Sequence, residues 1–596
     1  MNSIKDFYIN RTEKGSCELN KIKRKLNLIS ILRLLSFVFF IFLPIKTYQA
    51  DVFFALISAI LFLVIFLYLV RLHGRVKTKK LYTQNLLEIY KNELLSLDHV
   101  FSQFEGGEEF IDPSHINSYD LDLFGKGSLF QFLNRTFIKS GKNKLAGSLL
   151  NPLEDPLKIR QRQETVKELA ARTDWRHSFS AKGKIYIEDE NFKSIIDVWE
   201  EEKYILKSGK IIKPLLIILP LLSVLTLLIW IFGGISVFFL FSCIIQLAFW
   251  LYERKKTSLI YTKFGKRQQI LSLYAYMIEM IESSDWKSTE SIEMVKRLKV
   301  NKATSKEIFR LKKITSLYDN RNNFLVGFLL NMIFMWDLMF SYFLLRWNEK
   351  NKGNYKIWDN TIAFYDAMNS FANFNFNHPE YIYPVLSDNK FEINTQSLGH
   401  PLINSQKRIG NDFIINDKNF ITIITGANMA GKSTFLRTVG VNLILAMNGA
   451  PVCASSFKFS PVELFSNMRT TDSLFSDESY FFAELKRLKA ILDEINKGRN
   501  ILIILDEILK GTNSEDKLKG SQKLIKKLIE LKTPTIIATH DIKLTELENQ
   551  YSGIIRNLCF EIEIKDEEMH FDYTIREGVT KTMNATFLMK KMGIIE

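Results

Sequence analysis

A phosphate-binding loop is the most specific chemical feature of the sequence. Residues 420–434 read FITIITGANMAGKST, a β-branched run followed by Gly426, four residues, and then Gly431, Lys432 and Ser433. In such a loop the backbone amides wrap around phosphates at the start of a helix, while the lysine reaches the outer phosphates and the serine hydroxyl holds Mg²⁺. The pattern predicts ATP and Mg²⁺ as cofactors, bound by Gly426, Ala427, Asn428, Met429, Ala430, Gly431, Lys432, Ser433 and Thr434.

Two later segments could supply the rest of a hydrolytic site. Residues 501–507, ILIILDE, are typical of a buried parallel strand that delivers two acids to its carboxyl edge. We expect Asp506 to bind Mg²⁺ through its water shell, and Glu507 to orient or deprotonate the attacking water. Residues 535–540, TIIATH, predict another short strand ending in His540, where a γ-phosphate sensor would lie. A strand-end histidine is by itself more often a simple hydrogen-bonded residue, so the order of the three motifs carries this prediction.

Long apolar segments precede these motifs. Val52–Val70 contains no charged residue and is close to the roughly 20 residues that cross a bilayer core. Leu26–Ile45 is also apolar, although it contains an arginine and a proline, and a short loop joins it to the next span. Pro214–Tyr252 is uncharged and has Gly233 and Gly234 near its middle. The sequence therefore predicts two transmembrane hairpins.

Lysine and arginine cluster at the outer ends of both hairpins, in residues 21–25, 71–80, 203–213 and 254–256, whereas the internal turns are nearly uncharged. The positive-inside rule then places both termini and all large segments in the cytoplasm. We predict a multi-pass protein of the cytoplasmic membrane, with membrane lipids as partners and the nucleotide site facing the cytoplasm. The alternative is a soluble protein in which both hairpins are buried.

Phe324–Leu345 is a third apolar stretch, with Asn331 and Asp337 in its middle. A fifth crossing would place the nucleotide site outside the cell, where ATP is lacking. We therefore predict a buried helix of a soluble domain here.

Composition and periodicity bound the domain organisation. The 596 residues carry a net charge of +15 and are 47% hydrophobic, which excludes a disordered chain. Four cysteines lie far apart, so neither disulfides nor zinc are expected, and the compartment should be reducing. The predicted fold class is α + α/β. It comprises a basic N-terminus with the first hairpin (1–80), an all-α core in two parts (81–210 and 253–390) that flank the second hairpin (211–252), and a C-terminal P-loop α/β ATPase domain (391–596).

Several motifs resemble the MutS family of ATPases. TGANMAGKSTFLR is similar to the family's TGPNMGGKSTYMR, and LDEILKGTNSEDKLKGS to LDEIGRGTSTxDGLSLA. The second likeness implies that Gly511, Thr512 and Asp516 lie in a loop that crosses to a partner subunit. MRTTDSLFSDESYFFAEL resembles the segment containing STFMVEM, which implies that Ser479 acts in trans on the opposite γ-phosphate and that Glu484 matches.

The likeness extends upstream. HPLI at 400–403 and FIIND at 413–417 resemble the family's entry to the ATPase domain, which implies that Phe413 stacks on adenine. For an isolated phenylalanine, plain core packing is the commoner role. Residues 120–169 and 362–374 are similar to the opening and closing segments of the family's lever domain. Together these matches imply a homodimer with composite ATP sites and helical levers.

The departures from the family also shape the hypothesis. The first 118 residues contain no counterpart of the mismatch-reading domain, so mismatch recognition is not expected. The second hairpin leaves little room for a DNA clamp, and the dimerisation appendage that would follow residues 584–594 is not expected. The leading hypothesis is a membrane-anchored MutS-like ATPase. The alternatives are a membrane tether for DNA in which ATP gates the grip, and an ABC-like ATPase that acts on a protein or lipid partner.

Overall fold

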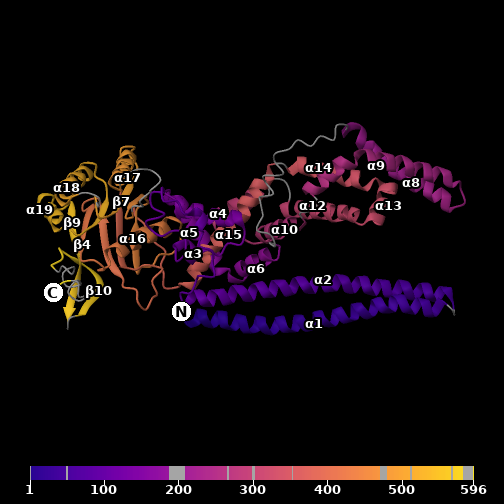
Figure 1. Cartoon of the computed structure of the whole chain (residues 1–596), viewed down its shortest axis with the longest axis horizontal. Helices are drawn as coiled ribbons and strands as arrows, with labels where there is room; N and C mark the ends of the chain where they lie inside the picture. Colours follow the sequence, from indigo (N-terminus) through magenta and orange to yellow (C-terminus); the bar gives the residue numbers. More distant parts are fainter. Residues whose placement is uncertain are drawn as a thin grey trace.

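The computed structural model describes residues 2–48, 51–186, 209–264, 268–298, 303–351, 353–469, 480–509, 513–565, 568–581 and 595. These residues form an elongated arrangement (Figure 1), with an α/β domain at one end and the tips of two helical hairpins at the other. An all-helical core lies between them. The predicted combination of all-α and α/β parts is confirmed at this level.

The first hairpin is longer than the two spans predicted for it. Its helices are α1 (Asn2–Tyr48) and α2 (Val52–Leu97), and they pack against one another along their length. Asp51 caps α2 by accepting from the Phe53 amide at 2.7 Å. The boundary expected at residue 80 therefore falls inside α2, because the apolar span continues into a helix whose inner end packs on the core through Tyr90 and Leu97.

The second hairpin is helical, and its helices extend beyond the predicted bounds of 211–252. Helix α8 (Gly209–Ile231) and helix α9 (Ser236–Phe264) are joined by a turn in which Gly233 has φ 92°. Between the helices, the Ser223 and Ser242 hydroxyls lie 3.0 Å apart and Gln246 donates to Ser223. Such buried polar contacts are common between packed apolar helices.

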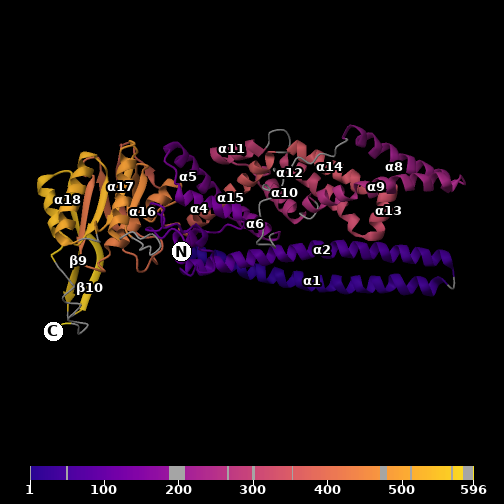
Figure 2. The ribbon, with the colours of Figure 1, turned by 45° about the horizontal axis from the view of Figure 1, so that its top comes forward.

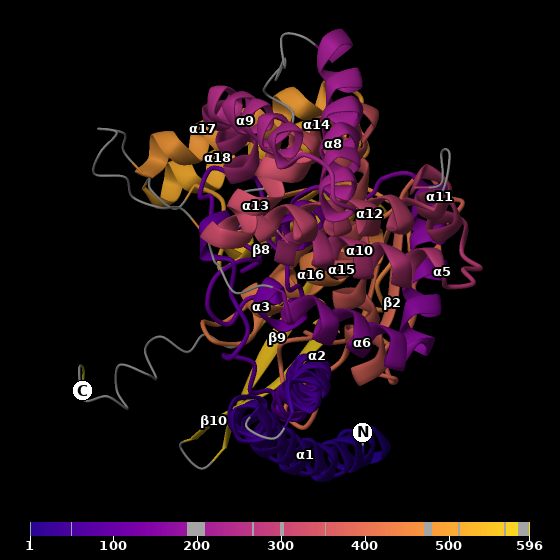
Figure 3. The same cartoon turned by 90° about the vertical axis from the view of Figure 1, so that its right-hand side faces the viewer.

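Among the described residues, four helices are long and apolar enough to cross a membrane, namely α1, α2, α8 and α9. Figures 1 and 2 show that the tips of both hairpins lie at the same end of the molecule. Viewed along the long axis (Figure 3), the hairpins lie on different sides of it. Their apolar side chains at the tips are largely exposed, for example Phe53 at 66% and Phe232 at 85%.

Phe324–Leu345 is not the single buried helix that we predicted. The chain forms α13 (Phe324–Phe334) and α14 (Trp336–Asn351), bent by 79°, with Met335 at φ 50° between them. Asn331 turns the chain, because its side chain accepts from the Asp337 amide at 2.8 Å. Helix α14 is mostly buried, but α13 packs on α8 and α9 and leaves Phe324 82% exposed. The pair could count as a fifth, broken span by length and composition.

The helical core surrounds one buried helix, α15 (Asn354–Asn377). Its neighbours include α4, α5, α6 and α10, which come from both sides of the second hairpin in sequence. The remaining core helices are α3 (Leu129–Leu133), α4 (Lys139–Leu150), α5 (Pro156–Ala171), α6 (Thr173–Lys184), α10 (Gln268–Glu282), α11 (Thr289–Leu298) and α12 (Thr304–Tyr318).

The α/β domain contains two sheets. The six-stranded sheet has the order β10-β9-β4-β8-β7-β6 and is parallel except for β10, whereas the smaller sheet has the order β1-β5-β2-β3. The strands are β1 (Val385–Leu386), β2 (Glu392–Leu398), β3 (Asn411–Asn416), β4 (Ile421–Gly426), β5 (Ser456–Phe459), β6 (Glu463–Asn467), β7 (Ile501–Asp506), β8 (Thr535–Thr539), β9 (Ile555–Lys565) and β10 (Glu568–Glu577). The helices are α16 (Lys432–Met447), α17 (Tyr480–Ile495), α18 (Ser514–Glu530) and α19 (Leu547–Gln550). The three motif strands β4, β8 and β7 are adjacent, so their carboxyl ends meet at one edge.

Candidate functional site

The predicted phosphate loop connects β4 to α16. Gly426 has φ 154° and Gly431 has φ 106°, conformations that side-chain-bearing residues rarely adopt. A Cβ on Gly426 would also lie 2.9 Å from the Phe560 carbonyl oxygen. The Lys432 amine donates to the carbonyls of Gly426 and Ala427 at 2.7 and 2.9 Å. The lysine thus closes the loop, at the N-terminus of a 16-residue helix.

The predicted acids and histidine converge on this loop. Asp506 ends β7 and Glu507 follows with φ 60°, held by donation of its amide to the Ala538 carbonyl at 2.8 Å. His540 Nε2 lies 3.4 Å from Glu507 Oε1 and 3.3 Å from Lys432 Nζ. The other carboxylate oxygen of Glu507, Oε2, lies 3.6 Å from Lys517 Nζ. The three motifs therefore meet in one cluster.

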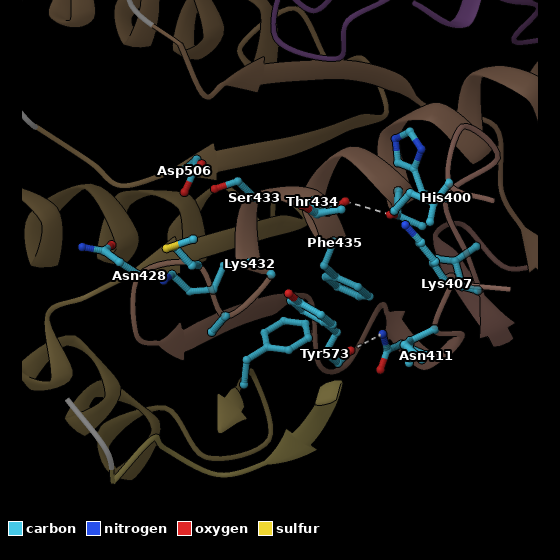
Figure 4. Close-up of a pocket in the computed structure, with 18 of the residues that line it drawn as sticks. His400, Lys407, Asn411, Asn428, Lys432, Ser433, Thr434, Phe435, Asp506 and Tyr573 are labelled. Carbon is cyan, nitrogen blue, oxygen red and sulfur yellow. Dashed lines mark hydrogen bonds between the residues drawn. The ribbon is translucent and has the colours of Figure 1, made fainter. Parts of the chain in front are cut away.

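A cavity of about 550 Å³ joins these residues. Figure 4 shows Ser433 and Asp506 directed toward one another at one end, with His400, Lys407 and Asn411 at the other. Of the predicted loop residues, Asn428, Met429, Ala430, Gly431, Lys432, Ser433 and Thr434 line it. Gly426 and Ala427 lie behind the lining and hold the Lys432 amine through their carbonyls.

Burial sets the charge of the cluster. It lowers the pKa of Lys432 to about 8, although the Asp506 and Glu507 carboxylates oppose this shift. Burial also lowers the pKa of His540, and the neighbouring Lys432 ammonium lowers it further. At neutral pH the site therefore combines a mostly charged lysine with a neutral histidine.

Several aromatic side chains line the cavity, but Phe413 is not among them. Phe413 is only 2% exposed and packs edge-on against Phe435, with ring centroids 5.4 Å apart, so it does not line the cavity. The adenine-stacking role implied for Phe413 stays a prediction, and the buried ring lies behind the cavity wall. Tyr573 lines the cavity and is 45% exposed.

Tyr573 occupies an irregularity in β10. The pairing of β10 with β9 shifts register between Phe571 and Ile575, and Tyr573 has φ 53°. Asn411 fixes this bend, because its amide donates to the Tyr573 carbonyl at 3.0 Å and accepts from the Ile575 amide at 2.8 Å. No motif marked Tyr573 or Asn411. Only the aromatic character of the strand could have drawn attention to Tyr573.

Comparison with known proteins agrees with this geometry. The family model described as MutS domain V matches residues 422–591. The C-terminal domain of this chain is therefore of the MutS type. The chain is 33% identical to a DNA mismatch repair protein MutS of Aquifex pyrophilus over 210 residues, which cover 35% of this chain and 24% of the relative. For the protein of the same name from Acetivibrio thermocellus the identity is 36% over 203 residues (33% and 22%), and for human MutS protein homolog 4 it is 30% over 241 residues (39% and 25%).

The chain thus spans about a quarter of the length of each of these relatives. Some of the residues implied by the MutS resemblance lie outside the described part of the chain, namely Ser479, Gly511, Thr512 and residues 584–594. Asp516 is described, in the first turn of α18, where its amide donates to Asn513 Oδ1 at 2.9 Å.

Glu484 has a clear structural role in the MutS-type domain. It is 1% exposed, and its carboxylate accepts from the Leu509 amide at 2.6 Å. Leu509 follows the catalytic candidate Glu507 by two positions and has φ 59°. Glu484 therefore positions the segment that leaves β7.

The MutS-type domain is attached to the helical core through two aspartates. The Asp120 carboxylate, fully buried, accepts from Ser466 Oγ at 2.9 Å, from the Arg469 amide at 2.9 Å and from Arg487 Nη2 at 2.8 Å. Asp122 pairs with Arg469 at 2.6 Å. Arg437 of α16 donates to the Asp120 carbonyl at 3.0 Å, so the helix that begins at the phosphate loop contacts the same segment.

Proposed function

We propose that this chain is a membrane-anchored MutS-like ATPase that binds ATP and Mg²⁺, hydrolyses the γ-phosphate bond at composite dimer sites, and moves its helical core. One observation carries the proposal: on the wall of a single cavity, His540 lies 3.3 Å from Lys432 and 3.4 Å from Glu507. The family match supports it, because MutS proteins are ATPases.

The residues present fit ATP and Mg²⁺. A volume of about 550 Å³ falls in the range of roughly 300–1,000 Å³ that small-molecule pockets span. Ser433 and Asp506 offer the oxygen ligands that Mg²⁺ prefers.

Each side chain has a distinct task in this proposal. Mg²⁺ would neutralise developing phosphate charge. Lys432 would exchange its contacts with the loop carbonyls for phosphate oxygens. Glu507 would take the proton of the attacking water, and His540, neutral by its lowered pKa, would donate to the γ-phosphate. The family resemblance assigns Ser479 of a second copy to the same phosphate.

Membrane anchoring rests on four features of the hairpins. Each helix is long and apolar enough to cross a bilayer, their tips lie at one end, their apolar side chains are exposed there, and basic residues flank them. The large exposed apolar surface would otherwise be a liability in water. Lipid is therefore the partner that best fits it, and the MutS-type domain would face the cytoplasm.

The ATPase rate of the purified full chain in lipid nanodiscs tests the proposal. Wild type should hydrolyse ATP with Mg²⁺, Lys432→Ala should lose nucleotide binding, and Glu507→Gln should keep binding but lose about 10²–10⁴-fold in rate. Equal rates for all three proteins would refute the mechanism.

DNA binding is the second candidate function, because the matched relatives are named as DNA mismatch repair proteins. Adding duplex, mismatched or branched DNA to the same assay tests it. Stimulation that fades with rising salt would support a tether that tracks phosphates. A Lys432-dependent rate indifferent to every DNA would instead favour an ABC-like ATPase with a protein or lipid partner.

A further inference from the structure

A second cavity lies where the first hairpin joins the helical core. Its volume is about 460 Å³, and it shares no lining residue with the nucleotide site. The inner part of α2, the segments 103–105 and 134–137, helix α6 and helix α15 all contribute to its wall. Most of the lining side chains are polar or charged. Such a cavity between elements far apart in the sequence is the usual setting of a small-molecule site.

Two buried side chains in this wall lack protein partners. Asn369 of α15 is 3% exposed, and neither its amide nitrogen nor its oxygen has a hydrogen-bond partner among the described residues. His177 of α6 is 4% exposed, and both its ring nitrogens are likewise without a partner in the described part of the chain. Leaving a buried polar group unsatisfied costs roughly 1–3 kcal/mol, so the four unpaired atoms on these two lining residues would gain from a ligand that reaches them.

The buried end of the cavity also carries an excess positive charge. Arg176 is 2% exposed and donates to the Leu169 carbonyl at 2.9 Å and to Asn373 Oδ1 at 3.0 Å, both neutral groups. Within the described residues no carboxylate lies in ion-pair range of it. The neighbouring Glu93 is already paired with Arg135 at 2.6 Å and accepts from Asn377 at 2.8 Å. The two arginines, Arg135 and Arg176, and the single carboxylate of Glu93 therefore leave one positive charge without a counter-ion.

The other charged groups of the wall do not supply a counter-ion for this positive charge. Lys184 and Glu88 pair with one another at 3.0 Å. Glu105 pairs with Lys142 at 2.7 Å, and its side chain is 70% exposed. Water screens these outer pairs, whereas the charge on Arg176 lies in a medium where an unpaired ion is costly. Burial accordingly lowers the pKa of Arg176 to about 10.

We propose that this cavity binds a small organic molecule with a single carboxylate, placed beside Arg176 and receiving hydrogen bonds from Asn369 and His177. One negative charge balances the one excess positive charge, whereas a phosphate with two charges would leave a net negative site. Phe104 and Phe137 offer apolar contacts for the rest of the molecule. Because the wall joins α2 to α6 and α15, such a ligand would strengthen the attachment of the first hairpin to the core. This inference does not depend on ATP hydrolysis.

Binding can be measured on the full chain in nanodiscs by equilibrium dialysis with radiolabelled benzoate, at constant ionic strength set with chloride. We expect one saturable site per chain, competition by acetate, and little competition by inorganic phosphate. Amide hydrogen exchange in α6 and α15 should slow when benzoate is bound. Absence of saturable binding would overturn the proposal, and stronger competition by phosphate than by acetate would overturn the assignment to a carboxylate.

Two variants locate the site. Arg176→Met should abolish binding, and Asn369→Leu, which keeps the branching and the number of side-chain heavy atoms, should reduce it at least tenfold. Asn369→Leu should also unfold at a higher temperature than wild type without ligand, because it removes an unsatisfied buried amide. Asn496→Leu makes the same change at an exposed position of the MutS-type domain and should bind normally. Unchanged binding in Asn369→Leu would contradict the placement of the ligand beside Asn369. This outcome is informative even if Arg176→Met fails to fold.

Discussion

Arg487 and Asp120 lie 367 positions apart and form a buried ion pair of 2.8 Å that joins the MutS-type domain to the start of the helical core. Arg487 belongs to α17, one end of which borders the undescribed segment 470–479. Arg469, at the other border of that segment, is bound by Asp122. The connection to the core thus involves one residue that precedes segment 470–479 and one that follows it.

Asp120→Asn should destabilise the protein by about 3–5 kcal/mol, because it leaves the Arg487 guanidinium largely buried without a counter-charge. Denaturant unfolding followed by tryptophan fluorescence measures this effect. Asp122→Asn is the matched control: its side chain is 41% exposed, so the pair with Arg469 should contribute about 1 kcal/mol or less. Equal losses for the two variants would contradict a special role for Asp120.

The affinity for ATP should fall as the pH rises above about 8. In the free protein, burial lowers the pKa of Lys432 to about 8, so the ammonium is intact near pH 7 and is lost at higher pH. Phosphate binds the charged form, so affinity should be flat below pH 7 and drop toward tenfold per unit well above pH 8. Titrations with a non-hydrolysable ATP analogue between pH 6.5 and 9.5 test this. Lys432→Met should bind weakly at every pH, and a wild-type affinity constant across the range would show that Lys432 keeps its ordinary pKa.

Substitutions of Tyr573 and Phe413 should have different effects: the first should weaken nucleotide binding, and the second should lower the stability of the fold. Tyr573→Ala removes an exposed aromatic face of the cavity and should weaken nucleotide binding by about 1 kcal/mol or more, at least about fivefold, with little change in stability. Phe413→Ala removes a buried ring and should cost about 3–5 kcal/mol of stability. Fluorescent-nucleotide titration and denaturant unfolding of both variants provide the comparison. The reverse pattern would restore Phe413 as the base contact.

Helix α13 should contact lipid. Phe324 and Leu325 are 82% and 70% exposed, and α13 packs on both helices of the second hairpin. In a Cys17→Ser background, a fluorophore on Leu325→Cys should be quenched by nanodisc lipids that carry a nitroxide on the acyl chain. The same label on Glu349→Cys, an exposed position near the far end of α14, should not be quenched. Quenching at both positions or at neither would contradict this placement.

The convergence of the candidate site residues could be predicted from sequence because its signals are local. Gly426, Gly431 and Lys432 fix a loop by backbone geometry alone, and the apolar runs before Asp506 and His540 specify adjacent buried strands. The order of these strands in the sheet then brings the motifs together without further information. Each prediction needed only a short segment and a rule about where parallel strands end.

Other features depend on contacts distant in sequence. The bend at Met335 follows from Asn331 bonding to the Asp337 amide, and from Asp337 being held by Trp250 at 2.9 Å and by Arg321 at 3.2 Å. An apolar run read alone cannot reveal these partners. Tyr573 reaches the cavity only because Asn411, 162 positions earlier, fixes an irregular strand. Phe413 matched a family pattern, but its burial is decided by the ring of Phe435.

The length of the first hairpin would set the distance between a membrane and the MutS-type domain. Helix α1 has 47 residues and is therefore about 70 Å long, at about 1.5 Å per residue. If its apolar tip fills a bilayer core of about 30 Å, then about 40 Å of helix extends below the lipid. The MutS-type domain lies at the opposite end of the molecule (Figure 1). The hairpin would then act as a rigid spacer, so that an object touching both the membrane surface and the nucleotide-binding domain must itself span at least that gap.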